Sequence, residues 1–194
     1  IFWLGKTNLV FPSSLTRIGS WAFAHCTGLT GLTLPSSLIQ IEDRAFENCT
    51  GLTNLVLPAS LSELGYAAFA SCTSLTTLSL PASLTSIGGA AFSSCVELTN
   101  LTLPNGLHTI GEAAFANCTG LSTISFPRSL TVIENEAFLG CSSLASATFD
   151  GDALPSMNDS TFYLTSPSFM VSYYEGRSGF TTPTWLSYPT SVLK

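Results

Sequence analysis

Six cysteines and one adjacent histidine are the residues of this chain that could act as nucleophile and base. The cysteines recur at intervals of 23 residues, at Cys26, Cys49, Cys72, Cys95, Cys118 and Cys141. A constant interval predicts the same position in successive structural units, about 4.8 Å apart if strands pair between units. A disulfide needs a Cβ separation of roughly 3.5–4.5 Å. We therefore expect six buried free thiols rather than the disulfide framework that six cysteines in a small secreted chain usually form.

Catalysis and metal binding find little support elsewhere in the chain. His25 precedes Cys26, but a cysteine nucleophile must be accessible and activated. The segment DGDALPSMND offers Asp150, Asp152 and Asp159 as a faint calcium pattern, yet Leu154 stands where a calcium loop needs a ligand. No nucleophile, base and orienting group converge. The sequence predicts a protein without enzyme activity, metal or cofactor.

The charge of the chain limits its partners. Charged residues make up 9% of the sequence and hydrophobic residues 45%, and the net charge is −6 without any cluster of Lys or Arg. Phosphate backbones and anionic lipid surfaces attract basic patches, so nucleic acid is excluded as an expected partner. No apolar run is long enough to cross a bilayer and no basic-then-apolar leader opens the chain, which predicts no membrane insertion. Because the chain opens on Ile1, we expect a processed product or an excerpt of a longer protein.

The cysteine interval belongs to a repeat that organises most of the chain. The stretch Ser83 to Leu103 (SLTSIGGAAFSSCVELTNLTL) meets near-copies of itself when it is shifted by 23 residues, and proline recurs from Pro12 to Pro127 with the same interval. Phenylalanine follows the same period, at Phe23, Phe46, Phe69, Phe92, Phe115 and Phe138. Leucines spaced LxxLxL at this period indicate a leucine-rich solenoid. We expect the phenylalanines and cysteines to form columns that run through stacked coils.

Each coil is predicted to contain a strand and an outer turn. In Leu98 to Leu103 (LTNLTL), Leu101 and Leu103 alternate with polar residues, which predicts a short parallel strand on the inner face. The following Leu and Ile, three residues apart, fit either a second extended stretch or a tight helical turn. The segment GGAAFSSC is expected to form a helical or 3₁₀ turn on the outer face, since Phe92 and Cys95 are an i, i+3 pair. The fold class expected is an α/β repeat solenoid with 23-residue coils.

We expect one domain with two parts. Residues 1–149 form the repeat array, with a degenerate first coil at 1–12 in which Trp3 replaces the cysteine and Lys6 a leucine. Residues 150–194 change in composition and carry Phe180, Trp185 and Tyr188 after an expected strand at 168–174. A solenoid must cover its last apolar face. The sequence therefore predicts a C-terminal capping segment in residues 150–194.

The recurring LP, SLTSIG, AF and C positions resemble the BspA-like leucine-rich repeats, the Treponema-type class of bacterial surface proteins. The resemblance covers Leu9 to Phe149 without a gap. It implies an exported or cell-surface protein, without enzyme activity, that is used for adhesion or for binding other proteins. The shared motif consists of core positions, so no binding residue is implied by the resemblance.

Two surfaces are candidates for binding. The outward residues of the strands form a small neutral strip, with Asn54, Val56, Thr77, Ser79, Asn100, Thr102, Thr123 and Ser125 at its centre. Such residues also suit any solvent-facing strand. On the outer turns, Trp21 and Tyr66 either anchor a partner or pack against neighbouring coils. Four Asn-x-Ser/Thr sites are relevant only to a eukaryotic secretory pathway, at Asn48, Asn100, Asn117 and Asn158.

Two functions follow from these features. The first is a secreted or surface-displayed module that binds a protein or matrix ligand through the strand surface. The second is a structural subunit that associates through the ends of its solenoid, because an open end carries unpaired strand groups and repeated heterologous contacts make a filament or sheath. The family resemblance favours the binding module, and the low charge fits the filament.

Overall fold

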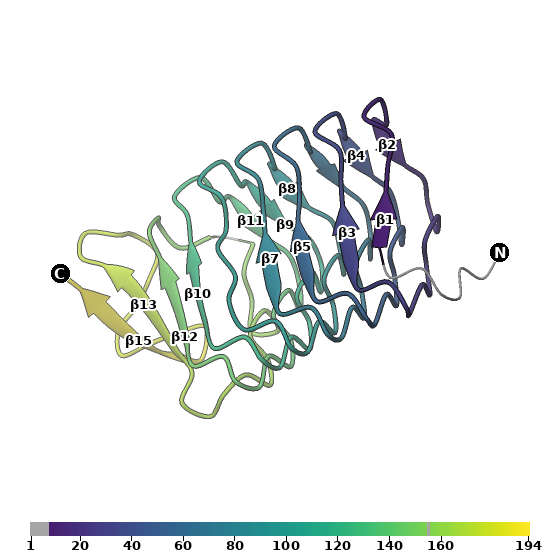
Figure 1. The fold of residues 1–194 in the computed structure, drawn as a ribbon. Coiled ribbons are helices and arrows are strands. Elements are labelled where there is room, and N and C mark those ends of the chain that lie inside the picture. The colour runs from purple at the N-terminus through teal and green to yellow at the C-terminus, as the bar shows by residue number, and fades with distance from the viewer. Residues whose placement is uncertain (1–7, 155) are drawn as a thin grey trace.

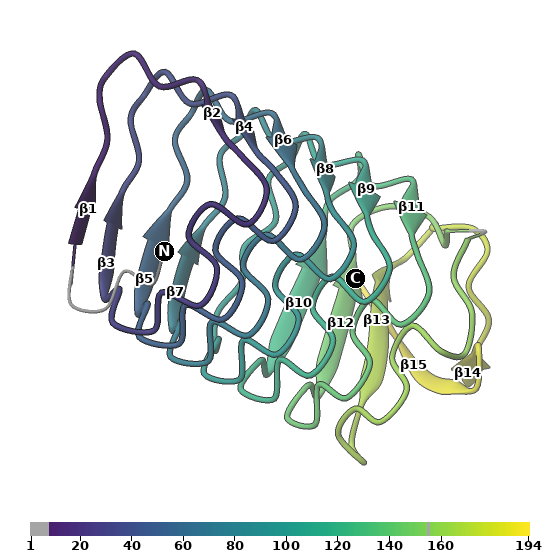
Figure 2. The ribbon, with the colours of Figure 1, turned by 90° about the vertical axis from the view of Figure 1, so that its right-hand side faces the viewer.

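The computed structural model describes residues 8–154 and 156–194, which form a parallel β-solenoid with two rows of strands (Figure 1). The sequence expectations for Trp3 and Lys6 lie outside the described residues. The first row contains β1 (Asn8–Val10), β3 (Gly31–Thr33), β5 (Asn54–Val56), β7 (Thr77–Ser79), β10 (Thr123–Phe126), β12 (Ser146–Phe149), β13 (Met170–Tyr174) and β15 (Tyr188–Leu193). The second row contains β2 (Arg17–Ile18), β4 (Gln40–Ile41), β6 (Glu63–Leu64), β8 (Ser86–Ile87), β9 (Thr109–Ile110) and β11 (Val132–Ile133). Figure 2 shows both rows side by side. The second stretch of each coil is thus extended, which decides the alternative that the sequence left open.

The register of the strands repeats the sequence period. Leu9 pairs with Leu32, and Ile18 pairs with Ile41, so identical positions of consecutive coils lie beside each other in parallel. The coil at residues 98–103 departs from this pattern, because it contributes only the bridge between Asn100 and Thr77 to the first row. Since a strand exposes alternate residues, Leu55 and Leu78 are buried while their neighbours on the strand face solvent.

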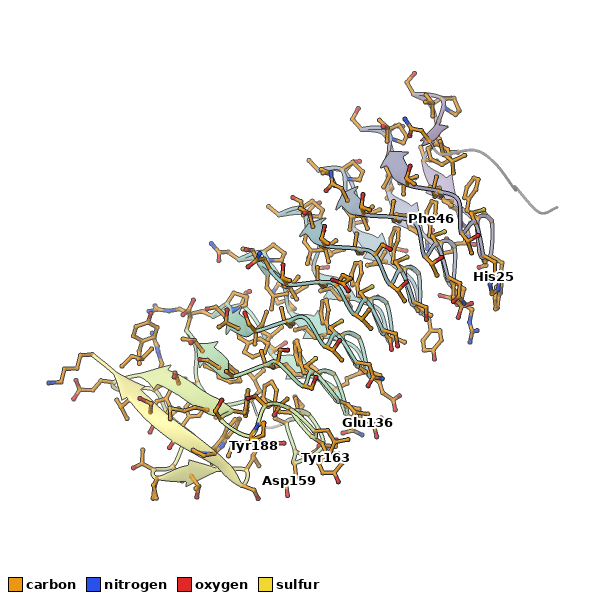
Figure 3. The ribbon with its side chains drawn as sticks, turned by 60° about the horizontal axis from the view of Figure 1, so that its bottom comes forward. His25, Phe46, Glu136, Asp159, Tyr163 and Tyr188 are labelled. Carbon is orange, nitrogen blue, oxygen red and sulfur yellow. The ribbon has the colours of Figure 1, made fainter. Side chains whose placement is uncertain are left out.

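The phenylalanine column runs through the centre of the coils. Ring centroids of consecutive phenylalanines from Phe23 to Phe138 are 5.1–5.7 Å apart, with planes inclined by 4–12°. From Phe46, which is labelled in Figure 3, to Phe138 these side chains are fully buried. No coil can bury its own apolar side, so each ring is covered by the coils before and after it.

The outer turns are not helical, and the expectation of helical or 3₁₀ turns on the outer face is wrong. No helix occurs in the described residues, so they contain no helix that is long and apolar enough to cross a membrane. Within one turn, Ala22 N–H bonds to Gly19 O and Ala24 N–H to Trp21 O, each three residues back. The alternate N–H groups of the turn donate to carbonyls of the following coil, as Phe23 N–H does to Ala45 O at 2.8 Å.

These coil-to-coil bonds explain why a helix does not form. Two residues of each of six outer turns have positive φ, such as Ala90 (52°) and Ser94 (61°) in one coil. The left-handed residues turn alternate N–H groups toward the next coil, whereas a helix would direct every N–H along its own axis. The second of these positions carries small or polar residues that tolerate this conformation: His25, Asn48, Ser71, Ser94, Asn117 and Gly140. Because these coil-to-coil bonds repeat along the array, the outer segments stack on one another as turns.

A column of serine hydroxyls joins the coils at the turns that lead from the first row of strands to the second. Each hydroxyl donates to a leucine carbonyl of the preceding coil at 2.6–2.7 Å, in the pairs Ser37–Leu15, Ser60–Leu38, Ser83–Leu61 and Ser129–Leu107. One coil lacks this bond because Gly106 occupies the serine position. The φ of Gly106 is not in the left-handed region, and a Cβ there would meet Ala82 O at 3.2 Å.

We expect Gly106→Ser to stabilise the chain by about 1 kcal/mol, because a typical hydrogen bond contributes about 0.5–1.5 kcal/mol and the loss of glycine restricts the unfolded chain. Equilibrium denaturation in urea measures the change. Gly106→Ala is the matched control, since alanine restricts the unfolded chain without supplying a hydroxyl. Equal stabilities of the two variants would contradict a role for the bond.

The C-terminal segment continues the first row of strands and then forms a short antiparallel hairpin at the edge of the sheet. β13 pairs in parallel with β12, and β15 pairs in parallel with β13. β14 (Thr184–Trp185) pairs antiparallel with β15 at the edge of this sheet. Phe180 stacks on Tyr173 at 4.4 Å and packs against Trp185, which is buried against Phe149. The large aromatic side chains of this segment thus lie over the last coils.

Candidate binding surfaces

The strand face consists of the outward side chains of the first strand row: Asn54, Val56, Thr77, Ser79, Asn100, Thr102, Thr123 and Ser125. All eight are exposed. Asn54 pairs with Thr77 and Thr77 with Asn100 along one row of this face, while Val56 pairs with Ser79 along the other. Asn100 donates to the hydroxyl of Thr99, and the other seven side chains make no hydrogen bond with another described residue. Their polar groups face solvent and are free to bond to a ligand.

Two shallow depressions accompany the strand rows, and sequence reasoning missed both. One of about 200 Å³ lies where the coil at 98–103 lacks a strand, and its lining includes Thr102, Ser125 and Asp150. The other, of about 310 Å³, lies on the second row and is lined by Gln40, Glu63 and neighbouring small polar residues. Neither is visible in the sequence, because each depends on how three consecutive coils meet.

Trp21 and Tyr66 lie on the outer turns of coils two apart, and Arg44 lies between them. The guanidinium carbon of Arg44 is 4.7 Å from the Trp21 ring centroid and 5.3 Å from that of Tyr66. A cation over an aromatic face at this distance is stabilised by the ring quadrupole. The rings are still 51% and 49% exposed. The two aromatic residues therefore pack through Arg44 and keep their outward edges in solvent.

The carboxylates around this cluster already have partners. Glu42 accepts hydrogen bonds from Ser20 and pairs with Arg17. Asp43 accepts from the backbone N–H of Tyr66 at 2.8 Å, and Glu47 pairs with Arg44 at 3.5 Å. These contacts link neighbouring outer turns, so the local charges stabilise the array and leave little net charge for a ligand.

The six cysteines are free and buried, and each of the last five donates its S–H to the backbone carbonyl of a phenylalanine, as Cys49 does to Phe23 O at 3.2 Å. Burial raises the pKa of the Cys49 and Cys141 thiols to about 12, and it raises the pKa of Cys26 as well. His25 is exposed on the outer turn beside Cys26 (Figure 3). A buried thiol with a raised pKa is a poor nucleophile, because the thiolate is the reactive form.

We expect iodoacetamide at pH 8 to alkylate Cys26 at least about tenfold faster than any other cysteine of the folded chain. The side chain of Cys26 is 8% exposed and the other five are 0% exposed, and a pKa of about 12 leaves only about one Cys49 thiol in ten thousand ionised at pH 8. Mass spectrometry of tryptic peptides over a time course measures the rates. Uniform labelling without denaturant would contradict the burial of the column.

Acidic residues do not assemble into a metal site in the part of the chain that the structure describes, since no group of three or more His, Cys, Asp or Glu residues could hold an ion. Asp152 instead accepts the N–H of Ser178 at 2.8 Å, and this hydrogen bond lowers the pKa of its carboxyl group. Asp152 thus links two parts of the C-terminal segment to each other rather than holding an ion.

The repeat is matched by the family model for the BspA type leucine rich repeat region, in six copies over residues 5–102 and 62–174. The chain belongs to the BspA-type leucine-rich repeat family. No curated protein matches the chain.

Two solved structures share the fold of this BspA-type chain. The leucine-rich repeat protein of T. pallidum is 26% identical with a TM-score of 0.54, and the match covers 86% of this chain and 72% of that protein. A leucine-rich repeat protein of Eubacterium ventriosum is 24% identical with a TM-score of 0.69, and the match covers 94% of this chain and 46% of that one. The BspA-type chain therefore spans less than half the length of the second protein.

Proposed function

We propose that this BspA-type array is a surface-displayed or secreted binding module, without enzyme activity, whose strand face contacts a protein or matrix ligand. The observation that carries the proposal is the strand face itself, which extends over several coils and exposes six polar side chains that make no hydrogen bond with another described residue. Arg and Lys are missing from these eight positions, so a ligand would be held by hydrogen bonds and close packing across many coils. Such binding is expected to be modest for each residue, since Trp, Tyr and Arg are the usual anchors of an interface.

The C-terminal end favours the binding module over the filament. End-to-end growth needs a free parallel strand at both ends of the solenoid. At the C-terminal end, β14 runs antiparallel to Tyr188 and Pro189 of β15, and the side chain of Trp185 in β14 is buried. The hairpin occupies the outer edge of β15 at Tyr188 and Pro189, where a further coil would otherwise add a parallel strand. We therefore propose a monomeric module.

Trp21 and Tyr66 are proposed to serve mainly as packing residues of the outer turns. Their contacts with Arg44 support this role, because the cluster joins three coils. If they anchored a partner instead, Trp21→Ala and Tyr66→Ala would weaken ligand binding without lowering thermal stability.

The proposal is tested with the double variant Thr77→Arg and Thr102→Arg, which places two long cationic side chains on the strand face. Beads coated with this variant should lose most of their adhesion to a panel of immobilised matrix and epithelial-surface proteins that capture the parent chain. Thr85→Arg with Thr131→Arg is the matched control, because both threonines are exposed beside the second strand row. Equal adhesion of all three proteins, or adhesion of none, would overturn the proposal.

A further inference from the structure

A groove runs between the last outer turns and the β14–β15 hairpin. One half has a volume of about 520 Å³ and is lined by residues of three outer turns, including Glu112, Glu136 and Asp159. The other half has a volume of about 310 Å³ and lies among Leu154, Trp185 and other apolar residues. Met157 and Leu186 line both halves, so the two cavities adjoin. The combined volume is in the range of ligand pockets, which is about 300–1,000 Å³.

The hairpin is held firmly at the groove. Leu186 and Ser187 connect β14 to β15 with φ values of 48° and 65°, the left-handed pair that a two-residue hairpin turn requires. Tyr188 donates its hydroxyl to Asp159 O at 2.5 Å and packs edge-on against Phe162. Figure 3 shows Tyr188, Asp159 and Glu136 in the same region at the end of the array. These contacts of Tyr188 hold the hairpin, and with it the groove wall formed by Leu186, against the last outer turn.

The two halves of the groove differ in chemistry. Three exposed carboxylates, those of Glu112, Glu136 and Asp159, line the larger half, and none forms a salt bridge with a residue that the structure describes. The neighbouring side-chain amides of Asn158 and Asn135 are hydrogen-bonded to each other, with Asn158 as the donor. No Lys or Arg lines either half. The groove thus places an unneutralised negative charge beside an apolar floor made by Leu154, Met157 and Trp185.

We propose that this groove binds a polypeptide segment in which lysine or arginine residues adjoin a large apolar residue. The cationic groups would lie against the three carboxylates, and the apolar side chain would lie on the floor beneath Leu186. The groove contains no residue of the strand face, so the proposal goes beyond the strand-face function and does not rest on it.

The test uses the whole chain and the synthetic peptide acetyl-Phe-Lys-Lys-Leu-amide, with binding followed by NMR chemical shifts. Saturable binding is expected, with the largest shifts at Met157, Trp185 and Leu186. The peptide acetyl-Phe-Glu-Glu-Leu-amide reverses the charge, and acetyl-Ser-Lys-Lys-Ser-amide removes the apolar groups; each should bind at least tenfold more weakly. Equal binding of either control peptide, shifts located elsewhere, or no saturable binding would overturn the proposal.

Two variants of the chain sharpen the test. Glu112→Gln combined with Glu136→Gln and Asp159→Asn should weaken binding of the Lys-Lys peptide at least tenfold, whereas Glu63→Gln with Glu97→Gln, which removes distant exposed carboxylates, should leave it unchanged. Leu186→Asn keeps a residue that tolerates the left-handed turn and should weaken binding at least threefold. Unchanged affinity in both groove variants, or an equal loss in the distant variant, would overturn the assignment of the groove.

Discussion

Replacing Phe92 by alanine is expected to lower the free energy of unfolding by about 3–5 kcal/mol, the usual cost of truncating a buried aromatic side chain. Phe92 is fully buried, and its ring lies 5.7 Å from Phe69 and 5.5 Å from Phe115. The substitution leaves a cavity that two coils line, and backbone bonds such as that from Phe92 N–H to Ala114 O prevent them from closing it. Urea denaturation followed by circular dichroism measures the loss.

Phe23→Ala is the matched control, because it removes the same ring from the same position near the first described coil. Phe23 is only partly buried, with Phe46 stacked on one side and the edge of Phe11 at 5.5 Å. The expected loss is smaller than at Phe92, since stability in a repeat array is a sum over neighbouring coils. Equal losses at the two positions would contradict the stacked column.

Gly88→Ala is expected to cost about 1–3 kcal/mol, the usual penalty for forcing extra volume into a packed site. A Cβ on Gly88 would lie 2.5 Å from Leu64 O and 2.6 Å from Gly65 O. Both oxygens are backbone atoms of the preceding coil and cannot move independently of it. Glu42 and Glu134 occupy the equivalent position in two other coils, so a neighbouring coil can shift enough to accept a side chain there. We therefore do not expect a loss of stability above this range. A thermal melt measures the change.

Gly19→Ala tests the same position where no described atom lies closer than an ordinary contact. The nearest described atom to a Cβ on Gly19 is the carboxylate oxygen Oε2 of Glu42 at 3.7 Å, an ordinary contact at the end of a flexible side chain. We expect a change of no more than about 0.5 kcal/mol, as for most surface substitutions. A loss at Gly19 as large as that at Gly88 would show that the requirement for glycine is local to the turn rather than due to coil-to-coil contact.

The repeat could be predicted from the sequence because one period governs every apolar column. The 23-residue spacing predicted the solenoid and the parallel strands. The outer turns were predicted wrongly, because Phe92 and Cys95 are also spaced as they would be in a helix. Coil-to-coil bonds, such as the one from Ser94 N–H to Ala116 O, decide the conformation instead. Those bonds depend on the neighbouring coil, which a pattern read within one coil does not include.

The candidate surfaces could be predicted only in part. Strand alternation predicted the strand face from residues such as Asn54 and Thr77. The contact between Trp21, Arg44 and Tyr66 follows from positions 23 or 22 residues apart, so closer attention to register could have found it. The groove had no signal in the sequence, because Leu186 and Glu112 come together only through the folding of the C-terminal hairpin onto the last coils.

The coil-to-coil hydrogen bonds of the outer turns have the same direction, from an N–H to a carbonyl of the following coil, in three parallel columns. Peptide dipoles aligned in this way add along the array, as they do in an α-helix, where they amount to about half an elementary charge at each end. In the first described turn, the carbonyls of Ser20, Ala22 and Ala24 are the acceptors at the negative end of this dipole, and no described residue donates to them. The outer face of the array is therefore electrically polar along its length, independently of its ionised side chains, and a cation approaching this face is favoured at the end where β1 lies.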